Sequence, residues 1–225
     1  MKRSEVNAAI RWAQALLASS GWRLPDMAYW SLDEWWANRN RLGTVRELML
    51  GWDITDFGTG DFAHVGAVLF TLRNGSARDS TLGVPYCEKL ILMQDGQHLP
   101  KHYHVFKTED IICRSGAPLQ VFLWKADKAG NELKENVHVA MDGIMREVPC
   151  GAPITVTQGN SISLTPYLAH VFGPVPGHGP VIVGEVSKVN DDRTDNYFLE
   201  PTARFADILE DEEMLVPLCN EYDRI

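Results

Sequence analysis

Short apolar runs follow one another from residue 62 to residue 189, and turn-forming residues separate them. Val, Ile, Phe and Tyr are frequent in these runs, as is typical of β-strands. Many short strands with regularly spaced turns favour a β-sandwich or a β-barrel. The strands expected from the runs span residues 65–72, 86–93, 110–114, 119–124, 137–141, 144–148, 154–156, 161–164, 169–172 and 181–189.

The first fifty residues have a different pattern, because their apolar positions recur at helical spacing. The first predicted helix has one apolar stripe and ends at Gly21. Residues 31–34 and 44–47 each have the form of a capping box, which predicts a second and a third short helix before Gly51. Residues 52–61 contain Gly, Asp and Thr and are predicted to form a loop. The apolar stripe of the first helix consists of Val6, Ala9, Ile10, Ala13, Leu16 and Leu17.

These patterns divide the chain into three parts. Residues 1–60 are predicted to form a helical extension packed on the β domain, residues 61–200 the β domain itself, and residues 201–225 a tail. The acidic run at residues 210–213 is expected to be the solvated face of a helix, and no chemistry is assigned to it. The extension is dense in tryptophan, and aromatic residues at such density usually pack a core or an interface. We therefore expect a homodimer.

The composition narrows the possible partners. A formal net charge of −9 makes nucleic acid and anionic membrane surfaces poor candidates. No apolar run reaches the length of a transmembrane helix, and Arg11 interrupts the apolar stretch near the start, so neither a membrane span nor a signal peptide is expected. The four cysteines form no CxxC pair and are expected to stay reduced. A cytoplasmic protein is predicted.

Two histidines mark the candidate site. His102 and His104 are two positions apart, so on a β-strand their side chains point to the same face and can bind one metal ion together. Glu109 lies an odd number of positions beyond His104, and an unbroken strand would point it to the other face. We therefore predict a turn or bulge at residues 107–108, followed by a strand over residues 110–114 that brings Glu109 back to the imidazoles.

Gly96 and Gly116 frame these residues in the spacing G-x5-H-x-H-x4-E-x6-G, which resembles the first motif of the cupin superfamily at every specified position. The second cupin motif, G-x5-P-x-G-x2-H-x3-N, is matched at Gly159 and His170. Other residues occupy its Pro, second Gly and Asn positions, namely Thr165, Tyr167 and Pro174. The resemblance implies a mainly β fold, the cupin double-stranded β-helix or jelly roll, with His170 as a further metal ligand.

Three imidazoles and one carboxylate suit a borderline divalent ion such as Mn, Fe, Co, Ni or Zn, and this set of donor atoms does not determine which of these metals is bound.

Further residues resemble one family of cupins, the D-lyxose isomerases. Residues 102–112 resemble its H-x-H-x-x-K-x-E-D-I-I run, and residues 184–196 resemble its G-E-V-S-x-V-N-D-D-x-x-D-N segment. Residues 88–90 and 2–7 resemble its strand entering the site and its helical start. The resemblance implies an isomerase that interconverts D-lyxose with D-xylulose and D-mannose with D-fructose, commonly with Mn.

Such an isomerisation moves a proton between C1 and C2 through an enediol, so it needs a base and positive charge near the oxygens. Glu185 lies on a late strand from which it could reach the metal, and we predict that it is the base; the alternative is a salt-bridged strand carboxylate. Lys107 and Lys89 are predicted to polarise the carbonyl or bind a hydroxyl, with a solvated strand end as the alternative for Lys89. No role is assigned to the remaining histidines, His64, His98, His138 and His178.

Two other functions are compatible with a cupin metal site, because one fold serves many reactions. A cupin dioxygenase would hold non-haem iron at the same ligands and would not need Lys107 or Glu185. A non-catalytic sugar-binding cupin would bind a pentose without converting it, and a partner domain would be expected. Oxygen uptake distinguishes the first alternative from an isomerase, and the absence of turnover distinguishes the second.

Overall fold

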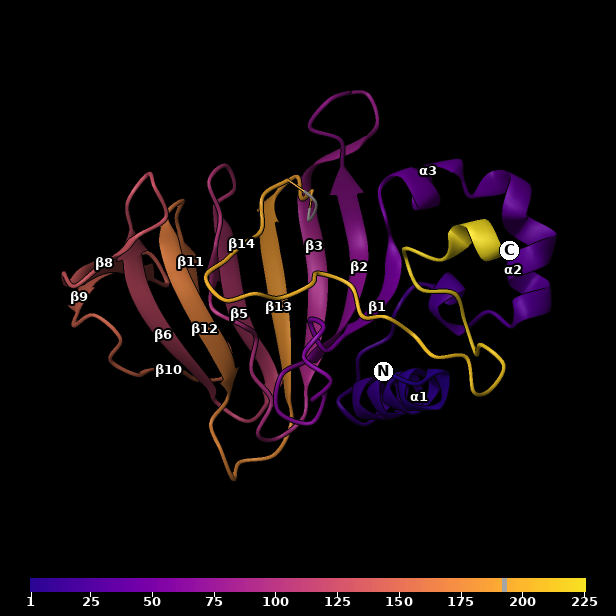
Figure 1. Cartoon of the computed structure of the whole chain (residues 1–225), viewed down its shortest axis with the longest axis horizontal. Coiled ribbons are helices and arrows are strands. Elements are labelled where there is room, and N and C mark those ends of the chain that lie inside the picture. The colour runs from indigo at the N-terminus through magenta and orange to yellow at the C-terminus, as the bar shows by residue number, and fades with distance from the viewer. Residues whose placement is uncertain (192–193) are drawn as a thin grey trace.

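Two curled antiparallel sheets contain most of the regular secondary structure of the computed structural model, which describes residues 1–191 and 194–225 (Figure 1). The larger sheet has the strand order β1-β2-β3-β13-β5-β11-β8-β9, and the smaller has the order β10-β6-β12-β4-β14, with β7 paired to β6. The prediction of a mainly β fold is confirmed. The larger sheet contains β1 (Gly51–Thr55), β2 (Ala67–Gly75), β3 (Gly83–Met93), β5 (Glu109–Gly116), β8 (Val137–Met141), β9 (Ile144–Val148), β11 (Ser161–Leu164) and β13 (Val181–Lys188). The smaller contains β4 (His102–Tyr103), β6 (Leu119–Ala126), β7 (Glu132–Leu133), β10 (Ile154–Val156), β12 (Leu168–Pro174) and β14 (Tyr197–Phe198).

The two faces of the larger sheet pack against different cores, because successive residues of a strand point to opposite sides. Leu69 and Ile91 belong to a core that also contains residues of the smaller sheet. Their neighbours Phe70 and Leu92 belong to a second core, which includes the apolar stripe of α1 (Arg3–Ser19). Strands β2 and β3 are therefore apolar on both faces. The helices lie at the β1 end of the larger sheet (Figure 1).

The first two predicted helices are confirmed, and the third differs in detail. Gly21, with a φ of 73°, follows α1. In the capping box of α2 (Leu32–Asn38), Ser31 and Glu34 each accept a hydrogen bond from the other's backbone N–H. The third helix, α3 (Gly43–Glu47), begins one residue before Thr44, so Thr44 does not cap it. The described residues also form 3-10 turns at η1 (Asp26–Tyr29), η2 (Arg39–Arg41) and η3 (Tyr222–Arg224).

The loop predicted for residues 52–61 is wrong at its start, where β1 extends the edge of the larger sheet. All five residues of β1 are buried. Trp52 and Ile54 join the core that α1 covers, and Asp53 points to the opposite face. The alternation of apolar and polar residues over residues 51–55 is typical of a β-strand, but the Gly, Asp and Thr residues that directly follow it favoured the prediction of a loop.

The acidic run at residues 210–213 is not a helix face, contrary to the prediction, but anchors the start of α1. The guanidinium of Arg3 is fully buried and donates hydrogen bonds to Glu210 at 2.8 and 2.9 Å and to Glu221, one of them at 3.1 Å. Hydrogen bonds from Arg3 and Arg224 lower the pKa of Glu210 to about 2. Two other carboxylates of the run accept hydrogen bonds from α1, Asp211 from Ser4 (2.9 Å) and Glu212 from Asn7 (2.6 Å).

The tryptophans of the extension are divided between two cores and form no single exposed surface among the described residues. Trp12, Trp22 and Trp52 pack in or against the core that α1 covers, and Trp30 and Trp35 pack in a smaller one. Trp35 is 1% exposed, lies edge-on to Trp30 at 5.2 Å and stacks on Tyr222 at 5.3 Å. Trp36 is 55% exposed. The homodimer and the three-part division of the chain stay predictions. In the described ranges, no helix has the length and apolar character needed to cross a membrane.

We expect Arg3→Met to lower the free energy of unfolding by about 3 kcal/mol, because removing one partner of a buried ion pair leaves the other charge uncompensated. Urea denaturation measures the change. The matched control is Arg23→Met, since Arg23 pairs with Asp26 at 3.2 Å and both side chains are at least 80% exposed; its expected effect is below about 1 kcal/mol. Equal stability of the two variants would contradict the role of Arg3.

Candidate active site and metal centre

Four side chains with metal-binding atoms meet where the two sheets face each other. His102 on β4 pairs across strands with His170 on β12, His104 follows β4 directly, and Glu109 begins β5. One ligand atom from each side chain lies within 4.8 Å of the other three. The chain turns between His104 and Glu109 as predicted, because β4 ends at Tyr103 and β5 begins at Glu109, but the bend lies at residues 105–106 and not at the predicted residues 107–108.

The three imidazoles turn the same nitrogen toward the centre of this cluster. The other nitrogen, Nδ1, lies at hydrogen-bond distance from a backbone carbonyl, which can only accept. The carbonyl partners are those of Pro100 for His102 (2.8 Å), Leu168 for His170 (2.9 Å) and Asp195 for His104. Nδ1 therefore carries a proton, and in a neutral ring Nε2 keeps a lone pair. Burial and the neighbouring imidazoles hold the pKa of His102 well below its ordinary value, so this ring is neutral.

These lone pairs face one another at short range. The Nε2 atoms of His102 and His170 are 3.1 Å apart, and Oε1 of Glu109 lies 3.2 Å from Nε2 of His170. Nε2 of His104 is buried and has no hydrogen-bond partner among the described residues. A divalent cation can bind all four donors at once, and three imidazoles with one carboxylate suit a borderline ion. The residues present therefore fit a divalent metal ion.

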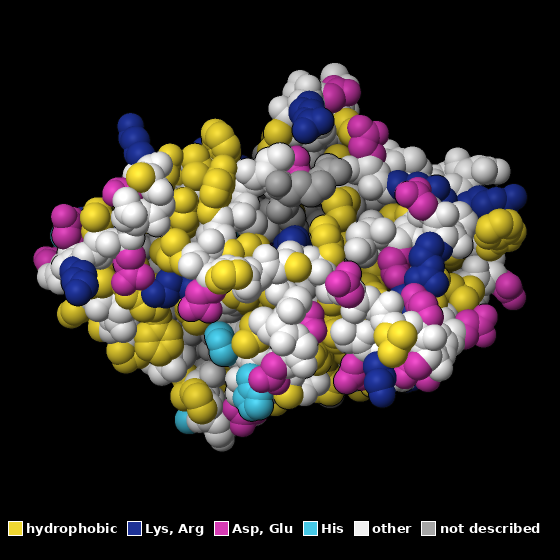
Figure 2. All heavy atoms as spheres, in the orientation of Figure 1, with side chains coloured by type: hydrophobic (Ala, Val, Ile, Leu, Met, Phe, Trp, Pro, Cys, Tyr) yellow, Lys and Arg dark blue, Asp and Glu magenta, His cyan; other side chains and the backbone are white. Residues whose placement is uncertain are grey.

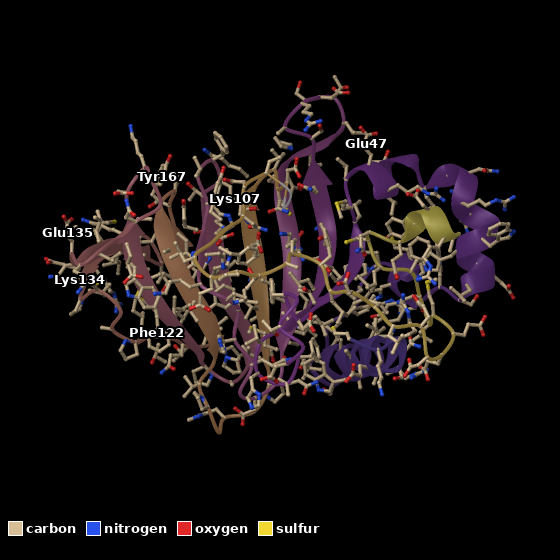
Figure 3. The ribbon with its side chains drawn as sticks, viewed as in Figure 1. Glu47, Lys107, Phe122, Lys134, Glu135 and Tyr167 are labelled. Carbon is tan, nitrogen blue, oxygen red and sulfur yellow. The ribbon has the colours of Figure 1, made fainter. Side chains whose placement is uncertain are left out.

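Lys107, which is labelled in Figure 3, joins this cluster to a second carboxylate through its two ion pairs. Its Nζ atom lies 2.9 Å from Oε2 of Glu109, 3.1 Å from Oε1 of Glu185 and 3.0 Å from Oδ1 of Asn190. Lys89, the cross-strand neighbour of Glu185, brings its Nζ atom to 3.4 Å from the same Oε1. Burial is the largest single effect and raises the pKa of the Glu109 carboxyl, but the Lys107 ammonium together with the neighbouring imidazoles of His104 and His170 holds the pKa well below its usual range.

A cavity opens beside the cluster, and its lining combines charged groups with apolar rings. The charged residues of the lining are Lys89, Lys107, Glu109, Glu185 and Arg204, and its apolar part includes Phe57, Leu99, Phe172 and Phe198. Lys89 is 3% exposed, so the alternative of a solvated strand end is wrong. Glu185 is ion-paired, as its alternative reading required, and it also lines the cavity. The carboxylate of Glu185 thus faces the cavity between two ammonium groups, where it can meet a proton of a bound molecule.

Known proteins match this chain over nearly all of its length. A family model described as D-lyxose isomerase matches residues 1–222. The D-lyxose/D-mannose isomerase of Escherichia coli O157:H7 is 41% identical over 99% of this chain and 98% of its own length. The chain belongs to the D-lyxose isomerase family. A second family member, the D-lyxose/D-mannose isomerase of Serratia proteamaculans, is also 41% identical, over 100% of this chain and 99% of its own.

Solved structures of L-ribose isomerases share the fold of this D-lyxose isomerase family member. The enzyme of Acinetobacter sp. DL28 in complex with L-ribose has a TM-score of 0.62 at 16% identity, covering 93% of this chain and 98% of that chain. The ligand-free enzyme of Cellulomonas parahominis has a TM-score of 0.58 at 18% identity, with the same coverage. At these identities the likeness shows the fold alone. The predicted aldose–ketose isomerase is confirmed at the level of the family, and a sugar is consistent with it as the substrate.

Sequence reasoning assigned no role to Arg204 or Asp195, and it gave Asn190, in the polar cluster at residues 190–192, as a residue that orients a loop or binds hydroxyls, with turn structure as the alternative. Arg204 lies in the tail and lines the cavity. Asn190 accepts a hydrogen bond from Lys107, and the backbone of Asp195 accepts one from His104. Asn190 and Asp195 belong to the segment over residues 184–196 that resembles the D-lyxose isomerases, and this resemblance was the available signal for both. Residues 192 and 193 of the segment lie outside the described ranges. Arg204 had no motif, because its role depends on where the tail crosses the sheets.

Replacing His104 by Ala should remove most of the bound metal and most of the activity, since one of four converging donors is lost. Elemental analysis of the purified protein measures the metal. His64→Ala is the control, because His64 is exposed and bonds to Asp61 away from the cluster. Unchanged metal content in His104→Ala would show that the proposed ligand set is wrong.

Proposed function

We propose that this protein interconverts D-lyxose with D-xylulose and D-mannose with D-fructose, using one divalent ion held by His102, His104, Glu109 and His170. Its relatives at 41% identity are named D-lyxose/D-mannose isomerases, which supports these substrates. The observation that carries the proposal is the convergence of three imidazole lone pairs and a carboxylate beside a buried ammonium–carboxylate pair. We propose Mn as the metal, with Zn, Fe, Co and Ni as alternatives.

A bound divalent ion would supply the positive charge that stabilises the oxygens of an enediolate. Glu185 removes the C2 proton of the aldose and returns it to C1, because its carboxylate lines the cavity and is fixed there by the ammonium groups of Lys107 at 3.1 Å and Lys89 at 3.4 Å. Lys107 and Lys89 orient this carboxylate, and their N–H groups can donate to the sugar carbonyl or to a hydroxyl. The apolar rings in the lining exclude water from the reacting carbons.

The two alternative functions have less support. A dioxygenase would leave the buried contacts of Lys107 with Glu109 and Glu185 without a chemical purpose. A non-catalytic sugar-binding cupin would not need a carboxylate placed to accept a proton.

We also propose a cytoplasmic homodimer. Hydrophobic side chains gather on the outer face of the smaller sheet near Phe122, which stacks with Trp124 at 6.4 Å, and such exposed patches often mark contacts between chains (Figures 2 and 3).

Incubation of the Mn-loaded protein with D-lyxose and with D-mannose should produce D-xylulose and D-fructose. A ketose-specific assay measures the products, and an oxygen electrode run on the same mixture should record no uptake. Metal-free protein prepared with a chelator is the control and should lose most of the turnover. Failure to convert either aldose, or oxygen uptake coupled to sugar loss, would overturn the proposed function.

Glu185→Gln should lower turnover by roughly 10² to 10⁴, because glutamine keeps the size of the side chain but cannot accept the proton. Sugar affinity should change much less, since the loss falls on the transition state. Exchange of the C2 proton with D₂O, followed by NMR, measures the proton transfer directly. Glu147→Gln is the control, because Glu147 is an exposed strand carboxylate that bonds to Asn136.

Proton exchange at the wild-type rate in Glu185→Gln would show that another group is the base. Loss of bound metal in this variant would point to a different error, namely that Glu185 belongs to the coordination shell. Metal content and proton exchange are therefore measured on the same protein preparation.

A further inference from the structure

We propose that Asp195 is a positioning residue that fixes both His104 and Lys107 for the reaction. The inference rests on the proposed function, because it assigns Asp195 a task only if His104 binds the metal and Lys107 serves the proton transfer. Asp195 is 7% exposed and lies between β13 and β14. It is absent from the cavity lining, so it acts through the residues that it holds.

The carboxylate of Asp195 accepts hydrogen bonds from three successive backbone N–H groups. Oδ1 accepts from Val105 at 2.7 Å and from Phe106 at 3.1 Å, and Oδ2 accepts from Lys107 at 3.0 Å. These three residues form the turn that separates His104 from Glu109. Three N–H dipoles that converge on one carboxylate form an anion-binding turn, and charge-assisted hydrogen bonds of this kind are stronger than neutral ones.

The backbone of Asp195 holds the other end of the same turn. Its carbonyl oxygen accepts the Nδ1 proton of His104. His102 and His170 differ in this respect, because each bonds to a carbonyl two residues earlier in its own segment. The tautomer and orientation of His104 therefore depend on a residue 91 positions away in the chain.

The turn also determines where the Lys107 ammonium lies. Asp195 fixes the backbone of Lys107, and the side chain extends from there to Glu109 and Glu185. Asp195 thus sets the orientation of the His104 imidazole and the position of the Lys107 ammonium group between the two carboxylates. The turn has little regular secondary structure of its own, and the hydrogen bonds described for the N–H groups of Val105 and Phe106 are those to the Asp195 carboxylate.

A carboxylate can meet this requirement, and a carboxamide cannot. Asn at position 195 would keep one acceptor oxygen and place an NH₂ group against at least one backbone N–H, where two donors face each other. Asp195→Asn therefore preserves side-chain volume while it disrupts the turn. Loss of such supporting hydrogen bonds around a metal ligand typically costs about 10- to 100-fold in metal affinity or activity.

The test compares Asp195→Asn with Asp127→Asn. Asp127 also accepts two backbone N–H bonds, from Ala129 at 2.8 Å and Asn131 at 2.9 Å, but it does so in a surface turn outside the cavity lining. Mn²⁺ affinity is measured by chelator competition on metal-free protein, kcat and KM are measured with D-mannose, and amide hydrogen exchange reports on residues 105–107. Circular dichroism establishes that each variant is folded, and Asp195→Ser, which keeps a small oxygen acceptor, replaces the Asn variant if that variant does not fold.

We expect Asp195→Asn to weaken Mn²⁺ binding and to lower kcat at saturating Mn²⁺, each by about tenfold or more, with KM changed less than threefold. Exchange should accelerate at residues 105–107, and Asp127→Asn should leave all four quantities near wild type. Wild-type Mn²⁺ affinity and kcat in the Asp195 variant would overturn the proposal. If the wild-type protein itself binds no Mn²⁺ and converts no aldose, the proposed function fails, and this inference fails with it.

Discussion

Mutual repulsion among buried lone pairs is the constraint that shapes the centre of this protein. Three Nε2 atoms and a carboxylate oxygen converge within a few ångströms, an arrangement that is unfavourable unless a cation offsets it. The imidazoles cannot turn away, because each Nδ1 atom is held by a backbone carbonyl. The pairing of β4 with β12 places two of these rings opposite each other. The fold therefore holds its donors in the orientation that a metal ion requires.

The charges around the cluster follow from the same constraint. A carboxylate that is buried beside imidazole nitrogens needs a compensating charge, and Lys107 provides it for Glu109 and for Glu185 together. Buried ion pairs of this kind contribute little to folding stability, because desolvation costs about as much as the attraction returns. The apolar faces of β2 and β3, which pack against two separate cores, supply the stability that allows this charged interior.

The sequence predicted the parts of the site that are local. The spacing of His102, His104 and Glu109 determines a strand, a turn and a returning strand, and those elements are present. His170 followed from a second motif, and the structure brings it to the cluster. The strand β1 was missed because glycines and polar residues directly follow its short alternating pattern. The part played by the Asp195 carboxylate could not be predicted, because it depends on the approach of two segments about ninety residues apart.

The attachments of the tail determine how one wall of the cavity is held in place. Arg204, which lines the cavity, belongs to the same tail that Arg3 anchors through Glu210 and Glu221. The contact between residues 3 and 221 spans 218 positions, so its formation closes a very long loop and belongs among the slow events of folding. Arg204 is held separately, because its guanidinium donates a hydrogen bond to Asp53 of β1 at 2.6 Å and its carbonyl accepts one from Thr55 at 3.0 Å. Opening of the Arg3 contacts at the start of α1 therefore leaves this wall of the cavity attached to the sheet, so the two ends of the tail can detach independently.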